Sequence, residues 1–190
     1  MEKFNHIELN NEVTKRGDNG FFKLEKDQEA IAEFLREVDH RTVKFSSEMK
    51  RLRYLVEENF YYNIFDKYIE DEIVECLELA KNFKFEFKSY MAASKFYKDY
   101  ALKTNDKKQY LENFNQHVFI VAMYLGDGNT ALAKELMIAM LEQRLQPATP
   151  TFLNSGRSRR GELVSCFLLE VGDSLNSINY IDSTAKQLSK

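Results

Sequence analysis

The chain has 190 residues, 44% of them hydrophobic, and a formal net charge of −3 at pH 7. A chain of this length forms one or two domains and can bury a core. Its longest apolar run, residues 117–126, is about half the length of a membrane span, and its start lacks the apolar region of a signal peptide. We therefore expect a cytoplasmic protein without a membrane partner. The mild net charge argues against nucleic-acid binding by charge alone.

Apolar residues at helical spacing predict a succession of helices as far as residue 145. The first follows the turn at residues 17–20 and covers residues 24–38, with Asp27 as a plausible N-cap. The same spacing predicts helices over residues 49–56, 69–80, 91–100, 111–125 and 132–140. The fifth of these six predicted helices ends at Gly126-Asp127-Gly128. These segments predict a mainly α protein.

The pattern changes after residue 145. Pro147 and Pro150 disfavour helix around themselves, so a loop is expected there. Residues 163–171 form a short apolar run that predicts a buried strand. Asp173 or Ser174 can then cap a final helix. Its apolar face contains Ile178, Ile181, Ala185 and Leu188.

Three arginines, Arg157, Arg159 and Arg160, lie in the predicted loop before the strand. Guanidinium groups pair well with phosphates, so a helical nucleic-acid binder is one hypothesis, and its affinity would fall steeply with salt. A solvated loop is the more usual meaning of such a run, and we favour it. Acidic helices elsewhere weigh against the nucleic-acid hypothesis.

The two cysteines, Cys76 and Cys166, are far apart and belong to no C-x-x-C or Cys/His cluster. Neither a disulfide scaffold nor a zinc site is indicated, and we expect no metal in this chain. Cys76 falls on the apolar stripe of a predicted helix, which favours core packing. Cys166 lies in the middle of the predicted strand, where a lone cysteine is also more often core than catalytic.

The sequence around Cys166 favours a role other than core packing. Residues 146–156 read QPATPTFLNSG and residues 160–169 read RGELVSCFLL. Together with HIELNN at residues 6–11 and YALKTNDK at residues 100–107, they resemble the large (alpha) subunit of class I ribonucleotide reductase, class Ib in particular. The resemblance covers essentially the whole chain.

The resemblance implies an N-terminal helical domain that ends in the first strand of a ten-stranded α/β barrel and the helix after it. By this reading residues 1–50 are a shortened ATP-cone-like segment, 51–145 a helical domain, and 146–190 the start of the catalytic barrel. The remnant of the cone spans residues 22–45, so full shutdown by ATP is not expected.

The family reduces ribonucleoside diphosphates to deoxyribonucleotides for DNA synthesis. It uses a tyrosyl radical made at a dimanganese or diiron centre in a separate beta subunit, and electrons from a glutaredoxin-like redoxin. The resemblance makes Cys166 one of two thiols that reduce the ribose 2′ position and end as a disulfide. It also makes Thr151 and Ser165 substrate contacts, although hydroxyls in such places commonly only cap turns.

Asp173, Ser174 and Leu175 match the family's site for the deoxynucleoside triphosphate effector at the interface of an alpha homodimer, although an aspartate there is also a good helix cap. The radical cysteine and the partner of Cys166 lie further along in the family, so these 190 residues are not expected to turn over alone. A C-terminal alpha piece from a split gene could supply them. The alternative is a stand-alone helical module that binds a nucleotide or a reductase subunit without catalysis. A following reading frame with a Gly-Gly-Gly turn would favour the enzyme.

Overall fold

A computed structural model describes residues 4–159 and 161–189, and it is mainly helical, as the sequence predicts. Its elements are α1 (His6–Val13), α2 (Glu25–His40), α3 (Glu48–Glu57), η1 (Ile64–Asp66), α4 (Glu70–Asn82), α5 (Tyr90–Lys95), η2 (Phe96–Tyr100), α6 (Phe114–Gly126), α7 (Thr130–Leu141), α8 (Thr149–Asn154) and α9 (Leu175–Leu188). Within the described part of the chain, no helix is long and apolar enough to cross a membrane.

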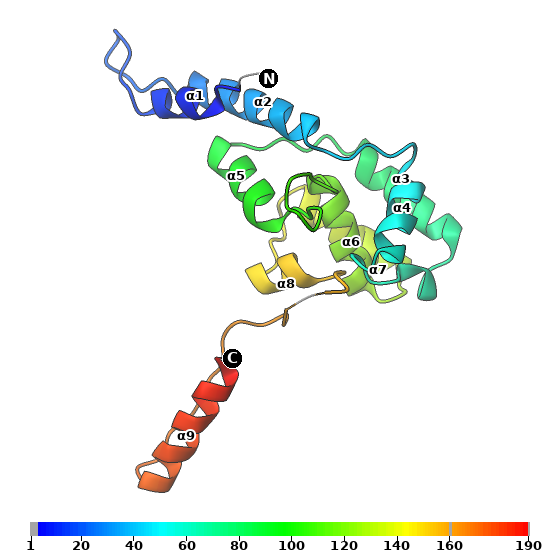
Figure 1. The fold of residues 1–190 in the computed structure, drawn as a ribbon, viewed down its shortest axis with the longest axis vertical. Coiled ribbons are helices and arrows are strands. Elements are labelled where there is room, and N and C mark those ends of the chain that lie inside the picture. The colour runs from blue at the N-terminus through cyan, green and yellow to red at the C-terminus, as the bar shows by residue number, and fades with distance from the viewer. Residues whose placement is uncertain (1–3, 160, 190) are drawn as a thin grey trace.

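Helix α6 is the centre of the helical body, and it packs against α7 and α4 (Figure 1). Residues 118–123 have no exposed surface. A helix that is apolar all round must be covered on every side, and the sequence from Val118 to Met123 contains no polar side chain. The helix ends at Asp127, which adopts a left-handed backbone conformation with φ of 44°. This confirms the predicted stop.

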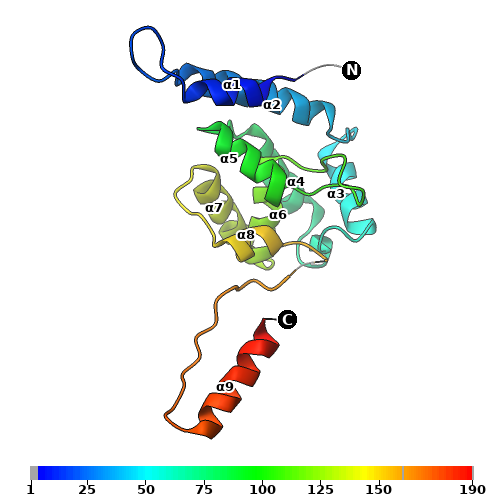
Figure 2. The same cartoon turned by 60° about the vertical axis from the view of Figure 1, so that its left-hand side comes forward.

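Helices α1 and α2 form a hairpin that lies across α5 (Figure 2). His6 of α1 joins all three helices, because its Nδ1 lies 2.8 Å from the Tyr90 hydroxyl and its Nε2 lies 2.8 Å from Glu37 Oε2. The predicted capping role of Asp27 is wrong. Helix α2 begins at Glu25, and the Asp27 carboxylate accepts a hydrogen bond from the Tyr90 backbone nitrogen instead, at 3.2 Å. Asp27 therefore supports the first turn of α5.

The expected loop around Pro150 is also wrong, because residues 149–154 form α8. Pro150 lies in the first turn of this helix. In that turn the backbone N–H groups have no partner within the helix, so the proline removes no helical hydrogen bond, and its fixed φ suits the helix. The six-residue length of α8 leaves it dependent on contacts with other parts of the chain.

The predicted strand does not form in the described residues. Residues 163–172 leave α8 without regular structure and lead to α9, which stands apart from the helical body in both views (Figures 1 and 2). Leu168 is fully exposed. A strand requires a neighbour to satisfy its backbone groups, and the described part of the chain provides no adjacent strand. We call residues 163–188 the C-terminal arm.

The cap of the final helix is as predicted. The Ser174 side chain accepts a hydrogen bond from the Ser177 backbone nitrogen at 3.2 Å and so starts α9. None of the residues of α9 is buried, so its apolar face is uncovered in this structure. The large exposed apolar residues of this helix are Leu175, Ile178, Tyr180 and Leu188.

Candidate functional site

The loop that follows α8 is bound closely to the helical body. The Tyr62 backbone nitrogen donates to the Gly156 carbonyl at 2.9 Å, and the Ser158 nitrogen donates to the Phe60 carbonyl at 3.0 Å. Gly156 has φ of +74°, and a Cβ at this position would lie 2.6 Å from Cγ1 of Ile120. Only glycine fits both the backbone conformation and the space. The backbone of residues 156–158 therefore lies directly on α6 and the segment after α3.

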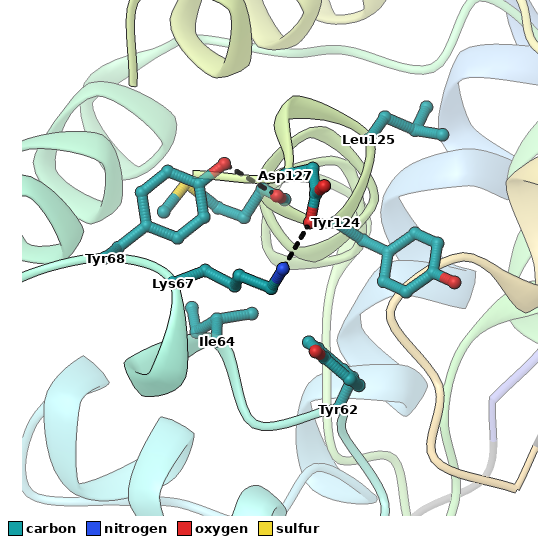
Figure 3. A pocket seen from close by; sticks show the side chains of 8 residues that line it. Tyr62, Ile64, Lys67, Tyr68, Tyr124, Leu125 and Asp127 are labelled. Carbon is teal, nitrogen blue, oxygen red and sulfur yellow. Dashed lines mark hydrogen bonds and ion pairs between the residues drawn. The ribbon is translucent and has the colours of Figure 1, made fainter. Parts of the chain in front are cut away.

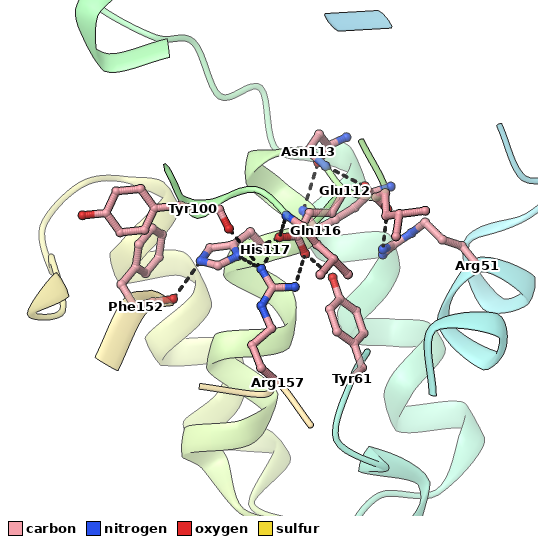
Figure 4. A network of polar contacts seen from close by, with 11 residues as sticks. Arg51, Tyr61, Tyr100, Glu112, Asn113, Gln116, His117, Phe152 and Arg157 are labelled. Atoms are coloured by element: carbon pink, nitrogen blue, oxygen red, sulfur yellow. Dashed lines mark hydrogen bonds and ion pairs between the residues drawn. The ribbon is translucent and has the colours of Figure 1, made fainter. Parts of the chain in front are cut away.

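Beneath this loop, Glu112 is the centre of a buried polar network (Figure 4). Only 1% of Glu112 is exposed. Its Oε1 accepts from the Leu102 backbone nitrogen at 2.8 Å, and its Oε2 accepts from the Tyr61 hydroxyl. The Arg157 guanidinium donates to both carboxylate oxygens, with Nη1 lying 3.2 Å from Oε2. A second bond from Arg157 Nη2 reaches the Tyr100 carbonyl at 3.2 Å. We call Tyr61, Glu112, His117 and Arg157 the buried network.

The charges of this network stabilise one another. Burial by itself would raise the pKa of the Glu112 carboxyl, but the positive charge of the Arg157 guanidinium and its hydrogen bonds hold that pKa well below its usual range. Burial would likewise lower the pKa of Arg157, and Glu112 more than offsets it. Burial, together with the charge of Glu112, raises the pKa of Tyr61, so its hydroxyl keeps its proton. The network is therefore an ion pair with a neutral tyrosine.

His117 connects the network to α8. Its Nε2 lies 2.8 Å from the Phe152 carbonyl oxygen, and a carbonyl only accepts, so Nε2 carries a proton. Its Nδ1 lies 3.0 Å from Glu112 Oε1 and 2.9 Å from Arg157 Nη2. The Phe152 ring also meets the imidazole edge to face, with 4.5 Å between ring centres. The backbone of α8 is thus bonded to the buried centre of the body.

These contacts correct the interpretation of the arginine cluster. Arg157 is not solvated, because only 7% of it is exposed and it pairs with Glu112. Arg159 is exposed, as expected of a solvated loop, and Arg160 lies outside the described residues. The sequence contains a signal elsewhere: His117 directly precedes the uninterrupted apolar run of residues 118–123, and a polar group buried there needs a partner.

The predicted substrate residues occupy two different environments. Thr151 is half-buried on α8, and its hydroxyl donates to the Leu163 carbonyl at 3.2 Å. Ser165 and Cys166 are exposed on the arm, with 3.8 Å between Ser165 Oγ and Cys166 Sγ. Thr151 therefore lies at the junction between the helical body and the arm. The structure does not enclose the three residues in one cavity.

The predicted effector residues Asp173, Ser174 and Leu175 are exposed at the start of α9, further along the arm. Their role and those of Thr151, Ser165 and Cys166 stay predictions.

The other cysteine behaves as predicted, because Cys76 is fully buried in the core. Burial raises the pKa of its thiol. Among the described residues, no group of three or more His, Cys, Asp or Glu side chains is placed to hold a metal ion.

A cavity of about 320 Å³ lies on the body beside the end of α6 (Figure 3). Lys67 and Asp127 pair across part of it, with 3.1 Å between Nζ and Oδ1, and Tyr68 donates to the Met123 carbonyl at 2.8 Å. None of the predicted substrate or effector residues lines this cavity. The charged groups of this cavity, Lys67 and Asp127, already pair with each other, so we assign no binding role to it.

Comparison with known proteins identifies the family. The model described as ribonucleotide reductase N-terminal matches residues 6–85, and the model described as ribonucleotide reductase, all-alpha domain matches residues 86–160. The chain is 48% identical over 188 residues to ribonucleoside-diphosphate reductase NrdEB subunit alpha of Bacillus subtilis. This alignment covers 98% of this chain and 17% of that relative.

Two further relatives agree. The identity to ribonucleoside-diphosphate reductase subunit alpha of Bacillus subtilis is 48% over 186 residues, or 97% of this chain and 26% of the relative. The identity to the subunit of the same name from Mycoplasma pneumoniae is 40% over 187 residues, or 97% of this chain and 25% of the relative. The chain thus spans between 17% and 26% of the length of these relatives. It belongs to the ribonucleotide reductase family, whose N-terminal and all-alpha domains it contains.

Proposed function

We propose that this chain is the N-terminal part of a ribonucleoside-diphosphate reductase alpha subunit, which reduces ribonucleoside diphosphates to deoxyribonucleotides. The observation that carries the proposal is the extent of the match: 98% of the chain aligns with a relative of that name at 48% identity. An alignment of that extent runs through α8 and into the arm, so it covers the segments that hold the predicted site. A stand-alone binding module would require no such match beyond the helical body.

In the proposed reaction, the Cys166 thiol acts with a second thiol outside this chain. The two thiols release two electrons and two protons and form one S–S bond, while the 2′ carbon of the ribose exchanges its hydroxyl for hydrogen and water leaves. Exchange with an external dithiol breaks the S–S bond and resets the pair. The exposure of Cys166 supports this role, because both its partner thiol and the external dithiol must reach the sulfur.

Thr151 and Ser165 are proposed to hold the substrate. Their hydroxyls can donate to or accept from sugar and diphosphate oxygens without adding charge. The position of Thr151 supports this assignment, because its hydroxyl donates to the carbonyl of Leu163, which lies two residues before Ser165 in the chain. Together, Thr151, Ser165 and Cys166 form the proposed substrate edge.

Asp173, Ser174 and Leu175 are proposed to take part in binding a deoxynucleoside triphosphate effector where two alpha subunits meet. The start of α9 supports the assignment, because the free N–H groups of a helix start favour phosphate, and the uncovered apolar face of α9 suits a second copy. The division into residues 1–50, 51–145 and 146–190 also stays a prediction.

The proposed partners follow from the family. They are a beta subunit that makes a tyrosyl radical at a dimanganese or diiron centre, a glutaredoxin-like redoxin and a second alpha subunit. The radical initiates the chemistry when the beta subunit is bound, and the residues of this chain contribute the reducing thiol and the substrate edge. A cytoplasmic location is proposed because such a redoxin keeps the thiols reduced there.

The test uses a complete alpha subunit whose N-terminal part is this sequence, for example one joined to the remaining part of the Bacillus subtilis relative. With a beta subunit and a redoxin, it should reduce ribonucleoside diphosphates over many turnovers. Cys166→Ser should abolish multiple turnover while leaving the fold intact, because serine cannot form the disulfide. Cys76→Ser is the matched control and should cost stability only. An inactive parent enzyme, or equal losses in the two folded variants, would contradict the proposal.

A further inference from the structure

The buried network bonds α8 to the body at a point next to Thr151. The Phe152 carbonyl accepts from His117, and Phe152 directly follows Thr151 in the chain. On the other side of α8, Arg157 holds the following loop to Glu112. Helix α8 contains the first of these bonds and is followed by the second. It has only six residues, so its orientation depends on contacts with other parts of the chain. The direction of the Thr151 side chain is therefore set largely by bonds from outside α8.

The polar character of this anchor is informative. Burying an ion pair and an imidazole requires the removal of their water, and a well-packed apolar cluster of similar volume is commonly at least as stable. An apolar cluster, however, fixes no particular backbone atom. The network bonds defined backbone groups instead: Phe152 O, Tyr100 O and Leu102 N. Its geometry suits the precise placement of a segment better than it suits stability alone.

We propose that Glu112, His117 and Arg157 are positioning residues, which fix α8 so that Thr151 meets the substrate; this inference rests on the proposed function. They touch no substrate themselves. Glu112 orients Arg157 and His117, His117 holds the α8 backbone at Phe152, and Arg157 holds the loop behind it. The Thr151 bond to the Leu163 carbonyl extends this placement to the start of the arm that carries Ser165 and Cys166.

The first experiment compares variants of His117 in the complete alpha subunit. His117→Leu removes the donor to Phe152 O while keeping a similar volume, and it should lower kcat/KM for a ribonucleoside diphosphate roughly ten- to a hundredfold. His117→Gln keeps a donor for Phe152 O and an acceptor for Arg157, so it should recover most of that loss. Ile73→Ala is the control, because Ile73 is buried in α4 and its truncation should lower stability without changing kcat/KM well below the unfolding temperature. Should His117→Leu fail to fold, Arg157→Lys replaces it, since lysine keeps the charge and loses the two-pronged bond.

The second experiment is a double-mutant cycle with Thr151→Val, which removes the hydroxyl at nearly constant shape. When His117 acts through Thr151, the double variant loses no more kcat/KM than the more damaging single variant. Losses that multiply, or an equal loss in Ile73→Ala, would overturn the positioning role while leaving the proposed function intact. A parent enzyme that reduces no ribonucleotide would instead refute the proposed function, and the positioning role with it.

Discussion

Residues 149–158 and the C-terminal arm are neighbours in the sequence, but they differ in how their structure is maintained. Residues 149–158 form a short segment that contains a proline. The segment is nevertheless hydrogen-bonded to the helical body at Phe152, Gly156, Arg157 and Ser158. The arm has the stronger local pattern, with an apolar run and a capped helix of 14 residues, yet none of its side chains is buried.

The comparison shows that local propensity and tertiary bonding act separately in this protein. Helix α9 forms because its own cap and spacing favour it, but it has no surface to pack against among the described residues. Helix α8 and the loop after it have a weaker local signal, and they are fixed by partners that lie 35 or more residues away in the sequence. The proposed substrate edge spans both regions, so one side of it is fixed within this chain and the other depends on further structure.

The largest effect on stability is expected when the buried ion pair that anchors residues 149–158 is removed. Glu112→Ala leaves the Arg157 guanidinium buried without its carboxylate, and the free energy of unfolding should fall by about 3–5 kcal/mol. Leu168→Ser on the arm is the control and should change it by less than about 0.5 kcal/mol, because Leu168 is fully exposed. Urea denaturation followed by circular dichroism measures both. Similar small losses in the two variants would show that residues 149–158 are no better anchored than the arm.

A smaller effect is expected on the free energy of unfolding at acidic pH. The pKa of Glu112 is lower in the folded than in the unfolded chain, so its ionised form stabilises the fold above the unfolded pKa of about 4. That contribution is lost as the pH falls from about 5 through strongly acidic values. Because other carboxyls titrate in the same range, the measurement compares the parent chain with Glu112→Gln, whose stability should depend less on pH over this range. Parallel pH profiles for the two proteins would contradict the ionised state of Glu112.

The smallest effect on stability is expected in the arm. Asp173→Ala should leave the free energy of unfolding within about 0.5 kcal/mol, since Asp173 is exposed and Ser174 caps the helix. In the complete alpha subunit it should nevertheless weaken the change in substrate preference caused by thymidine triphosphate. The measurement is the ratio of the four diphosphates reduced with and without this effector. An unchanged ratio would restrict Asp173 to a local structural role.

The sequence predicts local features of this fold well. The spacing of apolar residues identifies the helices from α2 to α7, the stop at Asp127 and the burial of Cys76, because each depends on neighbours within a few turns. The helical form of residues 149–154 goes against the prediction, because proline disfavours the interior of a helix but suits its first turn, where Pro150 lies.

The long-range features could not be predicted in the same way. The three arginines look alike in the sequence, and only the fold brings Arg157 to Glu112 and His117. The run at residues 163–171 has the composition of a buried strand, but a strand also needs a partner, which no local pattern supplies. The substrate and effector residues were assigned by resemblance to the family, and their roles depend on the experiments proposed above.

Amide hydrogen exchange tests the contrast between the two regions most directly. In the purified 190-residue chain, the hydrogen-bonded amides of Phe152, Ser155, Arg157 and Ser158 should exchange only through opening of the helical body, because the segment that contains them is bonded to the buried network. The amides of residues 163–171 should exchange at the rate of an unstructured peptide, and they should become protected in the complete alpha subunit. Equal exchange of the two segments in the isolated chain, or an arm that stays unprotected in the complete subunit, would contradict this account.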